Sequence, residues 1–145
     1  MVKQRKSKNI INRKARFEYT FVESLEAGIV LTGEEIKSVR ANKVSLTGSH
    51  IKIINNEAWW VGGVILVAGG DQQRTRKLLL HSEEIRRLSS KSEGKNLTIV
   101  PTKIYIKNGK AKLEITLSRG KKLHDKREII KKRDLDLEAA RSIRH

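Results

Sequence analysis

Side chains suited to acid–base or metal chemistry are few in this chain and widely spaced. The four histidines, His50, His81, His124 and His145, show neither HExxH nor H-x-H spacing, and there is no cysteine. The usual zinc ligand sets therefore cannot be assembled. The phosphate-loop pattern G-x-x-x-x-G-K-[ST] and the nucleophile pattern G-x-S-x-G do not occur either. We predict a protein with no metal, no cofactor and no catalytic residue, and hence not an enzyme.

Four carboxylates are the candidates for an alternative, a metal-dependent nuclease: Glu23, Glu26, Glu34 and Glu35. Carboxylates bind divalent cations. Their ordinary roles at these places are surface charge at a strand end and favourable charge at a helix N-terminus. The nuclease alternative requires RNA cleavage that disappears when Glu26 or Glu34 is substituted.

Basic side chains, in contrast, gather in four segments. The first, residues 12–16 (NRKAR), leads into a predicted strand. The second has Lys37, Arg40 and Lys43 at three-residue spacing, which places them on adjoining turns of one predicted helix face. The third, residues 74–77 (RTRK), is interpreted as a mobile cationic loop before an apolar run.

The fourth basic segment, residues 120–127 (GKKLHDKR), joins the body of the chain to its tail. Its His124 could stack on an RNA base while the flanking charges hold phosphate, although a histidine among lysines is usually just exposed. Because only 4% of the residues are aromatic, an extended stacking platform for single strands is not expected. Recognition of folded RNA by shape and backbone fits this composition better.

The charge balance indicates a polyanionic partner. The 145 residues carry 32 Lys+Arg against 16 Asp+Glu, a net charge of +16, and residues 1–16 contain seven basic side chains and no acid. Such a field favours nucleic acid over the alternatives of a solubility surface or anionic lipid. A lipid-binding protein would show a basic amphipathic helix with Trp on its apolar face, whereas Trp59 and Trp60 lie in a strand-like run.

Length and hydropathy predict one cytoplasmic domain. A chain of 145 residues fits one domain better than two. No apolar run approaches the ~18 residues of a membrane span, and the N-terminus lacks the ~7–15 apolar residues of a secretory signal. We therefore expect a soluble protein with no membrane partner.

The strongest structural signal is Asn108-Gly109, a pair that favours a two-residue type I′ hairpin turn. The resulting register pairs Ile106 with Ala111, Ile104 with Leu113, Thr102 with Ile115 and Val100 with Leu117, nearly all apolar residues on one face. The opposite face carries Lys103, Tyr105, Lys107, Lys110, Lys112 and Glu114. That lysine face is equally consistent with RNA contact and with an ordinary solvated surface.

Two further strand pairs are predicted. Asn55-Asn56 favours a second hairpin, because Asn tolerates the left-handed conformation. Upstream, Phe17–Leu25 alternates apolar and polar residues as a first strand. Gly28 then provides a bend, after which Ile29–Leu31 would pair back with that strand.

Two helices complete the predicted body. Thr32 and Glu35 have capping-box spacing for the first helix, and Ser82 starts the second, with Ile85 and Leu88 facing inward. Short strands with two or three short helices predict a mainly β fold, an OB-like closed antiparallel barrel.

The tail after residue 122 mixes charged and apolar residues. Glu128 precedes Lys131 and Lys132 by three and four residues, which supports a helix. We predict a marginal helix that is disordered alone and helical when bound. The predicted organisation is a flexible basic arm at residues 1–11, an OB-like RNA-binding barrel at residues 12–122 and the tail at residues 123–145.

Four motifs in this order carry a family resemblance: NRKAR at residues 12–16, EAGIVLTG at 26–33, RTRKLLLH at 74–81 and GKKLHDKR at 120–127. Together with Lys107-Asn108-Gly109, they make the chain resemble the bacterial SsrA-binding protein family, also called small protein B, from about Asn9 onward. The resemblance implies a monomer that binds the tRNA-like domain of transfer-messenger RNA (tmRNA) and delivers it to stalled ribosomes in trans-translation, or ribosome rescue. The barrel would mimic the anticodon arm, and the tail would probe the empty mRNA channel beside the decoding centre and its ribosomal RNA. Elongation factor Tu and alanyl-tRNA synthetase would be indirect partners through the RNA.

The resemblance also implies site residues. By position, Asn12, Glu26 and Leu79 would lie in or near the RNA-binding surface, where Glu26 would accept a hydrogen bond from a base or orient a neighbouring arginine. Together with the basic segments, the predicted RNA-binding residues are Asn12, Arg13, Lys14, Arg16, Glu26, Lys37, Arg40, Arg74, Arg76, Lys77 and Leu79. The predicted ribosome-binding residues, with His124 at the decoding centre, are Lys121, Lys122, His124, Asp125, Lys126, Arg127, Lys131, Lys132 and Arg133.

The chain departs from the family pattern at a few positions. Phe17 stands where the family often has histidine, Asn42 where glycine is usual and His50 where tyrosine is common; the loop at residues 67–73 is short, with Gln72 in place of a frequent proline. These departures affect loop shape and individual RNA contacts. A different alternative is a structural OB-type ribosomal RNA-binding protein, which would co-purify at one copy per ribosome and resist a high-salt wash.

Overall fold

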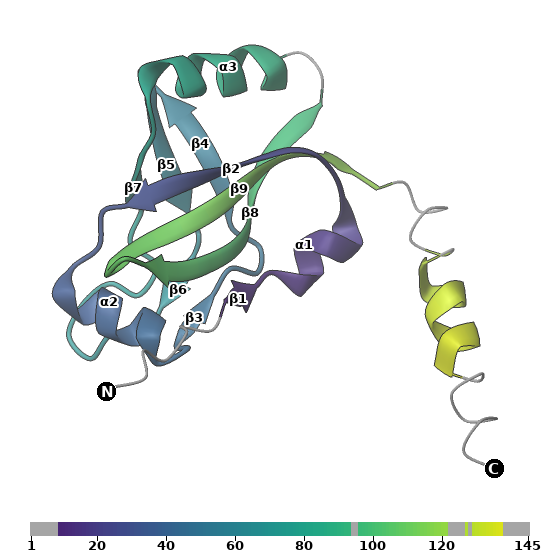
Figure 1. Cartoon of the computed structure of the whole chain (residues 1–145), viewed down its shortest axis with the longest axis horizontal. Coiled ribbons are helices and arrows are strands. Elements are labelled where there is room, and N and C mark those ends of the chain that lie inside the picture. Colours follow the sequence, from purple (N-terminus) through teal and green to yellow (C-terminus); the bar gives the residue numbers. More distant parts are fainter. Residues whose placement is uncertain (1–8, 94–95, 122–126, 128, 138–145) are drawn as a thin grey trace.

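The computed structural model describes residues 9–93, 96–121, 127 and 129–137 (Figure 1). Its main feature is a ring of strands in which each strand pairs antiparallel with the next and the last pairs with the first. In order around the ring, the strands are β8 (Leu97–Lys107), β4 (His50–Ile54), β5 (Glu57–Val61), β7 (Arg76–Leu79), β2 (Tyr19–Ile29) and β9 (Lys110–Gly120). The predicted mainly β, closed antiparallel barrel is confirmed.

Shorter elements surround this barrel. Strand β1 (Ile10–Ile11) pairs with β8, and β3 (Val44–Ser45) pairs with β6 (Val64–Ile65) as a separate small sheet. The helices are α1 (Arg13–Glu18), α2 (Gly33–Arg40) and α3 (Ser82–Ser92). Figure 1 shows α3 at the top of the barrel, and α2 and α1 on opposite sides of its lower part.

Apolar side chains from alternate strand positions fill the inside of the barrel. Trp60, Ile104, Leu113 and Ile115 are all completely buried; Trp60 comes from β5, and the other three come from the β8–β9 hairpin, which lies far from β5 in sequence. Burying each such side chain stabilises the fold by roughly 1.5–3 kcal/mol relative to leaving it exposed. The core therefore depends on closure of the ring, which brings these strands together.

The Asn108-Gly109 hairpin is confirmed, with both turn residues at positive φ, 52° and 75°. The predicted register is correct near the turn, where Ile106 pairs with Ala111 and Ile104 with Leu113. Farther along, the predicted Thr102–Ile115 and Val100–Leu117 pairs are wrong. A bulge between Pro101 and Lys103 shifts the register, so that Ile115 faces Pro101 and Leu117 faces Ile99. Proline has no N–H for the strand ladder, and bulges are where strands accommodate it.

The predicted first strand is wrong at its start and in its partner. Residues 13–18, which include Phe17, form α1 because Asn12 caps them: its Oδ1 accepts a hydrogen bond from the Ala15 N–H at 3.1 Å. Strand β2 then runs through Gly28 without a bend and pairs with β9 and β7, not with Ile29–Leu31. Ile10 and Ile11, placed by the sequence in a flexible arm, form β1 instead, and residues 1–8 lie outside the described residues.

Three other local predictions, the second hairpin and the starts of two helices, are confirmed. The second hairpin turns at Asn55 and Asn56, both at positive φ, 51° and 61°. The capping box of Thr32 and Glu35 begins α2, and α3 begins at Ser82 as predicted, with Ile85 and Leu88 buried. Lys43, however, lies beyond the end of α2, because the chain leaves the helix through Asn42 at φ 59°.

In the tail, residues 129–137 are helical. The predicted change from disorder to helix on binding stays a prediction. Among the described residues, no helix combines the length and the apolar character needed to cross a membrane.

Gly63 tests the packing of the core, since a Cβ added there would lie 2.0 Å from Cζ2 of the buried Trp60. We expect Gly63→Ala to lower the free energy of unfolding by about 2 kcal/mol or more, because the indole ring must move. Urea unfolding measures the change. In the control Gly69→Ala, the added Cβ meets nothing within 4 Å, and the loss should stay within about 0.5 kcal/mol. Equal losses in the two variants would contradict this packing.

Candidate nucleic-acid interface

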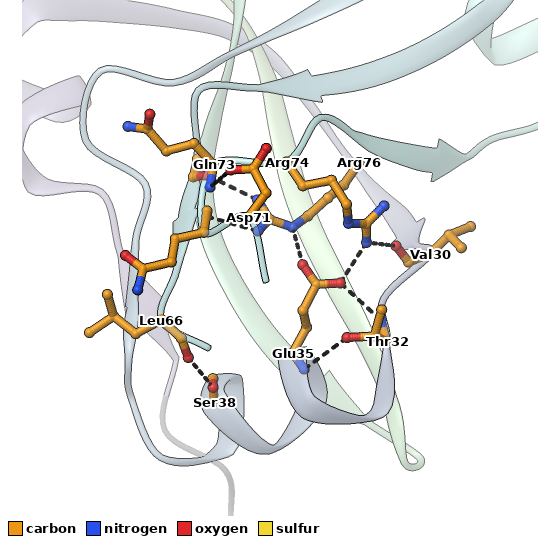
Figure 2. Close-up of polar contacts among 11 residues, drawn as sticks. Val30, Thr32, Glu35, Ser38, Leu66, Asp71, Gln73, Arg74 and Arg76 are labelled. Carbon is orange, nitrogen blue, oxygen red and sulfur yellow. Dashed lines mark hydrogen bonds and ion pairs between the residues drawn. The ribbon is translucent and has the colours of Figure 1, made fainter. Parts of the chain in front are cut away.

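A buried ion network holds the third basic segment in place (Figure 2). Glu35 of α2 accepts hydrogen bonds from Nε of Arg76 at 2.6 Å, from Nη2 of Arg74 at 2.5 Å and from the Thr32 N–H at 2.9 Å. Burial raises the pKa of Glu35, but these hydrogen bonds outweigh it and lower the pKa to about 2. Glu35 therefore stays ionised and joins α2 to β7.

Arg76 is the buried cation of this network. Its Nη1 donates to the Gly63 carbonyl at 2.9 Å and its Nη2 to the Gln72 carbonyl at 3.0 Å. The guanidinium lies over the Trp60 ring, 5.2 Å from its centroid. Because the side chain is 0% exposed, the prediction that Arg76 contacts RNA is wrong.

The interpretation of residues 74–77 as a mobile loop is also wrong, since β7 starts at Arg76 and Arg74 is held by Glu35. The Arg74 side chain remains 39% exposed. The network thus gives the two arginines of this segment different roles. Arg76 is buried and supports the fold, whereas Arg74 is presented at the surface.

A surface groove of about 640 Å³ brings together three of the predicted RNA-binding residues, Glu26, Lys77 and Leu79. Leu79 is 57% exposed, and it packs so closely on Gly28 that a Cβ there would lie 3.2 Å from the Leu79 Cβ. Lys112 of β9 also lines the groove. Sequence reasoning left Lys112 undecided, because alternation along a strand identifies its face and not its neighbours across the barrel.

Glu26 holds basic and hydroxyl groups at the edge of this groove. It accepts a hydrogen bond from the Tyr105 hydroxyl and lies 3.8 Å from Nζ of Lys107. The Tyr105 hydrogen bond is the main cause that lowers the pKa of Glu26, and the charges of Lys107 and Lys112 add to it against the opposing effect of burial. The protein neighbours that Glu26 orients are thus a tyrosine and a lysine, where an arginine was expected. The hydrogen bond expected from an RNA base stays a prediction.

A second cationic surface lies on α1, where Arg13, Lys14 and Arg16 are exposed. Asn12 differs from them, because it is buried beneath the helix. Its Nδ2 donates to the carbonyls of Pro101 at 2.8 Å and Leu46 at 3.3 Å. Both ends of its amide are therefore engaged in fixing α1 to the barrel, and the residue, 3% exposed, is not presented at the surface.

Lys37 and Arg40 form a third surface, exposed on α2. Helices α1 and α2 precede and follow β2, whose 11 residues span about 36 Å at ~3.3 Å each. The α1 residues therefore lie at the opposite end of β2 from α2 and the groove, and the predicted RNA-binding residues do not form one site.

The predicted ribosome-binding residues are only partly described. Lys121 caps α1: its N–H donates to the Glu18 carbonyl at 2.8 Å and its Nζ to the Arg16 carbonyl at 3.1 Å. Arg127 is exposed, as are Lys131, Lys132 and Arg133 on the tail helix. Lys122, His124, Asp125 and Lys126 lie outside the described residues.

Three of the four carboxylates considered for a nuclease, Glu23, Glu26 and Glu35, are engaged with other side chains. Glu35 is held by arginines, and Glu23 pairs with Arg87 at 2.7 Å and Lys91 at 2.6 Å, which ties α3 to β2. Within the part of the chain that the structure describes, no three His, Asp or Glu side chains cluster in a way that could hold a metal ion.

A closed OB-like barrel carrying separate cationic surfaces defines the class: an OB-type protein built to bind nucleic acid. Comparison with known proteins then identifies the family. The profile described as "SmpB protein" matches residues 9–145, and the chain belongs to the SmpB family.

Individual relatives agree with this assignment. The SsrA-binding protein of Oleidesulfovibrio alaskensis is 49% identical over 138 residues, covering 91% of this chain and 89% of that protein. That of Ligilactobacillus salivarius is 44% identical over 140 residues, covering 92% and 90%. A solved chain described as tmRNA–SmpB, in work on the centre of the bacterial ribosome, superposes with a TM-score of 0.70 at 43% identity, covering 84% of this chain and 94% of its own.

The buried charge of Glu35 provides a stability test. We expect Glu35→Gln to cost about 3–5 kcal/mol, because Arg76 stays buried without its counter-ion. The control Glu34→Gln removes an exposed charge from the same helix turn and should cost no more than about 1 kcal/mol. A similar loss in both variants, measured by urea unfolding at neutral pH, would contradict the role of the network.

The same network predicts a pH dependence. Glu35 has a pKa of about 2 in the fold against an ordinary value of 4.5, so its stabilisation is present above pH 4.5 and is lost as the pH falls towards 2. Stability curves of the wild type and Glu35→Gln should therefore converge over that interval, and parallel curves would show that Glu35 does not titrate there.

Proposed function

We propose that this protein binds the tRNA-like domain of tmRNA and delivers it to stalled ribosomes in the bacterial cytoplasm, with no catalytic step of its own. The observation that carries the proposal is the match, at 43% identity over 84% of the chain, to an SmpB chain described together with tmRNA and the bacterial ribosome. Elongation factor Tu and alanyl-tRNA synthetase would take part only through the RNA. Family membership favours this function over that of a structural ribosomal protein.

The geometry supports binding to folded RNA. The groove around Leu79 combines an exposed apolar side chain with Lys112 and with Lys77, which pairs with Glu57 at 3.6 Å. It therefore offers contact to a base or ribose, with Lys112 as its cation that has no such acidic partner among the described ion pairs. The cations of α1 lie at the other end of β2, a strand of 11 residues that is about 36 Å long. Only a folded RNA, or a long strand, reaches both surfaces at once.

The tail supplies a separate basic element. Lys131, Lys132 and Arg133 are exposed on its helix, and Lys121 fixes the start of the tail to α1. In the proposed function, the barrel recognises tmRNA and the tail enters the ribosomal mRNA channel when no message fills it.

The α1 cations can be tested through the salt dependence of binding. Arg13→Gln with Lys14→Gln should weaken binding to the tRNA-like domain and reduce the slope of log K against log salt by about two, one for each lost phosphate contact. The control pair Lys52→Gln and Arg86→Gln removes the same charge from exposed residues of β4 and α3. Equal slopes for the two double variants would exclude α1 as a phosphate-binding surface.

The groove can be tested at its exposed leucine. Leu79→Glu should leave stability within about 1 kcal/mol, because the side chain is mainly in solvent, and should weaken RNA binding by about tenfold or more by placing an anion beside RNA. Leu66→Glu is the control, since Leu66 is 47% exposed and does not line the groove. Fluorescence anisotropy with the labelled tRNA-like domain measures both, and unchanged affinity of Leu79→Glu would remove the groove from the interface.

A further inference from the structure

Helix α1 and the tail helix together enclose a space that neither forms alone. It measures about 650 Å³ and is lined by Arg13, Lys14, Arg16 and Phe17 of α1 and by Ile130 and Arg133 of the tail. Figure 1 shows the tail helix on the same side of the barrel as α1. Two segments more than a hundred residues apart in sequence thus face one another.

Every polar side chain in this lining is a cation. Lys14 has a partial partner in Glu18, 3.8 Å away. Within the described ranges, Arg13, Arg16 and Arg133 form no ion pair with an acid. Gathering like charges costs free energy, and an anion placed between the cations adds attractions that offset their mutual repulsion.

The lining also has an apolar part. The Arg133 guanidinium lies over the Phe17 ring, 5.3 Å from its centroid, and Ile130, beside it, is 47% exposed. A planar group can contact such a ring and an aliphatic side chain together. The chemistry that fits both parts is an anion joined to a flat heterocycle.

The tail is also attached beside this space. Nζ of Lys121 donates to the Arg16 carbonyl and its N–H to that of Glu18, so the tail leaves the barrel at the C-terminal end of α1. Lys121, just before the tail, and Arg133, within it, thus both contact α1.

We propose that this α1–tail pocket binds one nucleotide of an RNA strand, with its phosphate between Arg13, Arg16 and Arg133 and its base against Phe17 and Ile130. The inference rests on the proposed RNA-binding function and adds that α1 and the tail helix bind the same RNA strand. Arg133, which the family resemblance placed among the ribosome-binding residues of the tail, then acts together with the RNA-binding helix. The strand belongs to tmRNA or to ribosomal RNA, which share this chemistry.

The test compares Arg133→Gln with Lys132→Gln in the full chain. Both remove one positive charge from the same exposed helix, but only Arg133 lines the pocket. Binding is measured to two probes, the transcribed tRNA-like domain of tmRNA and purified small ribosomal subunits free of mRNA. One of the two probes contains the RNA strand that the pocket binds. For that probe, Arg133→Gln should lower the affinity about tenfold, which is the effect of losing one charge-assisted hydrogen bond. Lys132→Gln should lose about twofold or less, as an exposed charge does.

A second variant, Phe17→Ala, tests the part of the pocket that α1 contributes. It should weaken binding to the same probe that Arg133→Gln weakens. Equal effects of Arg133→Gln and Lys132→Gln on both probes would overturn the pocket. So would a loss on different probes for Phe17→Ala and Arg133→Gln. If the wild type itself fails to bind the tRNA-like domain, the proposed function fails instead, so the two failures can be told apart.

Discussion

The barrel depends on the ion pair that Glu35 makes with Arg76, whose guanidinium lies over the Trp60 ring. Burying two charges is costly unless their remaining hydrogen-bonding groups are satisfied. Here the carbonyls of Gly63 and Gln72 accept hydrogen bonds from the guanidinium. The carboxylate accepts hydrogen bonds from the Thr32 N–H and from Arg74. The pair therefore fixes α2, the chain around Gly63 and the start of β7 against the core in one step.

This constraint also decides what the surface presents. Once Arg76 is inside, Arg74 is held at the rim of the network, and β7 places Lys77 and the exposed Leu79 beside β2 and β9. The groove is thus assembled from β2, β5, β7, β9 and the start of α3, whose spacing the closed ring determines. At the other end of β2, Asn12 fixes α1 to the barrel through both ends of its amide, and the neighbouring cations Arg13, Lys14 and Arg16 are exposed.

Local rules predicted the parts of the fold that are local. The turns at Asn108-Gly109 and Asn55-Asn56, the capping box of Thr32 and Glu35, and the start of α3 each depend on a few adjacent residues. The failures have equally physical reasons. Alternation at Phe17–Phe21 resembled a strand, but the cap supplied by Asn12 made a six-residue helix. The bulge at Thr102 depends on Pro101 and on partners across β9, so no periodicity along β8 displays it.

By itself, the sequence determined the net charge of +16, the hairpin turns and the ordered motifs that indicated the family, because charge is a sum and turns are set by neighbouring residues. Only the tertiary structure decided which cations face a partner. Arg74 and Arg76 belong to one basic segment and have the same chemistry, yet one is 39% exposed and the other 0%. The residue that separates them, Glu35, is 41 positions away from Arg76 along the chain. Burial of a charge depends on a partner brought near by folding, and such a partner leaves no trace in the local pattern.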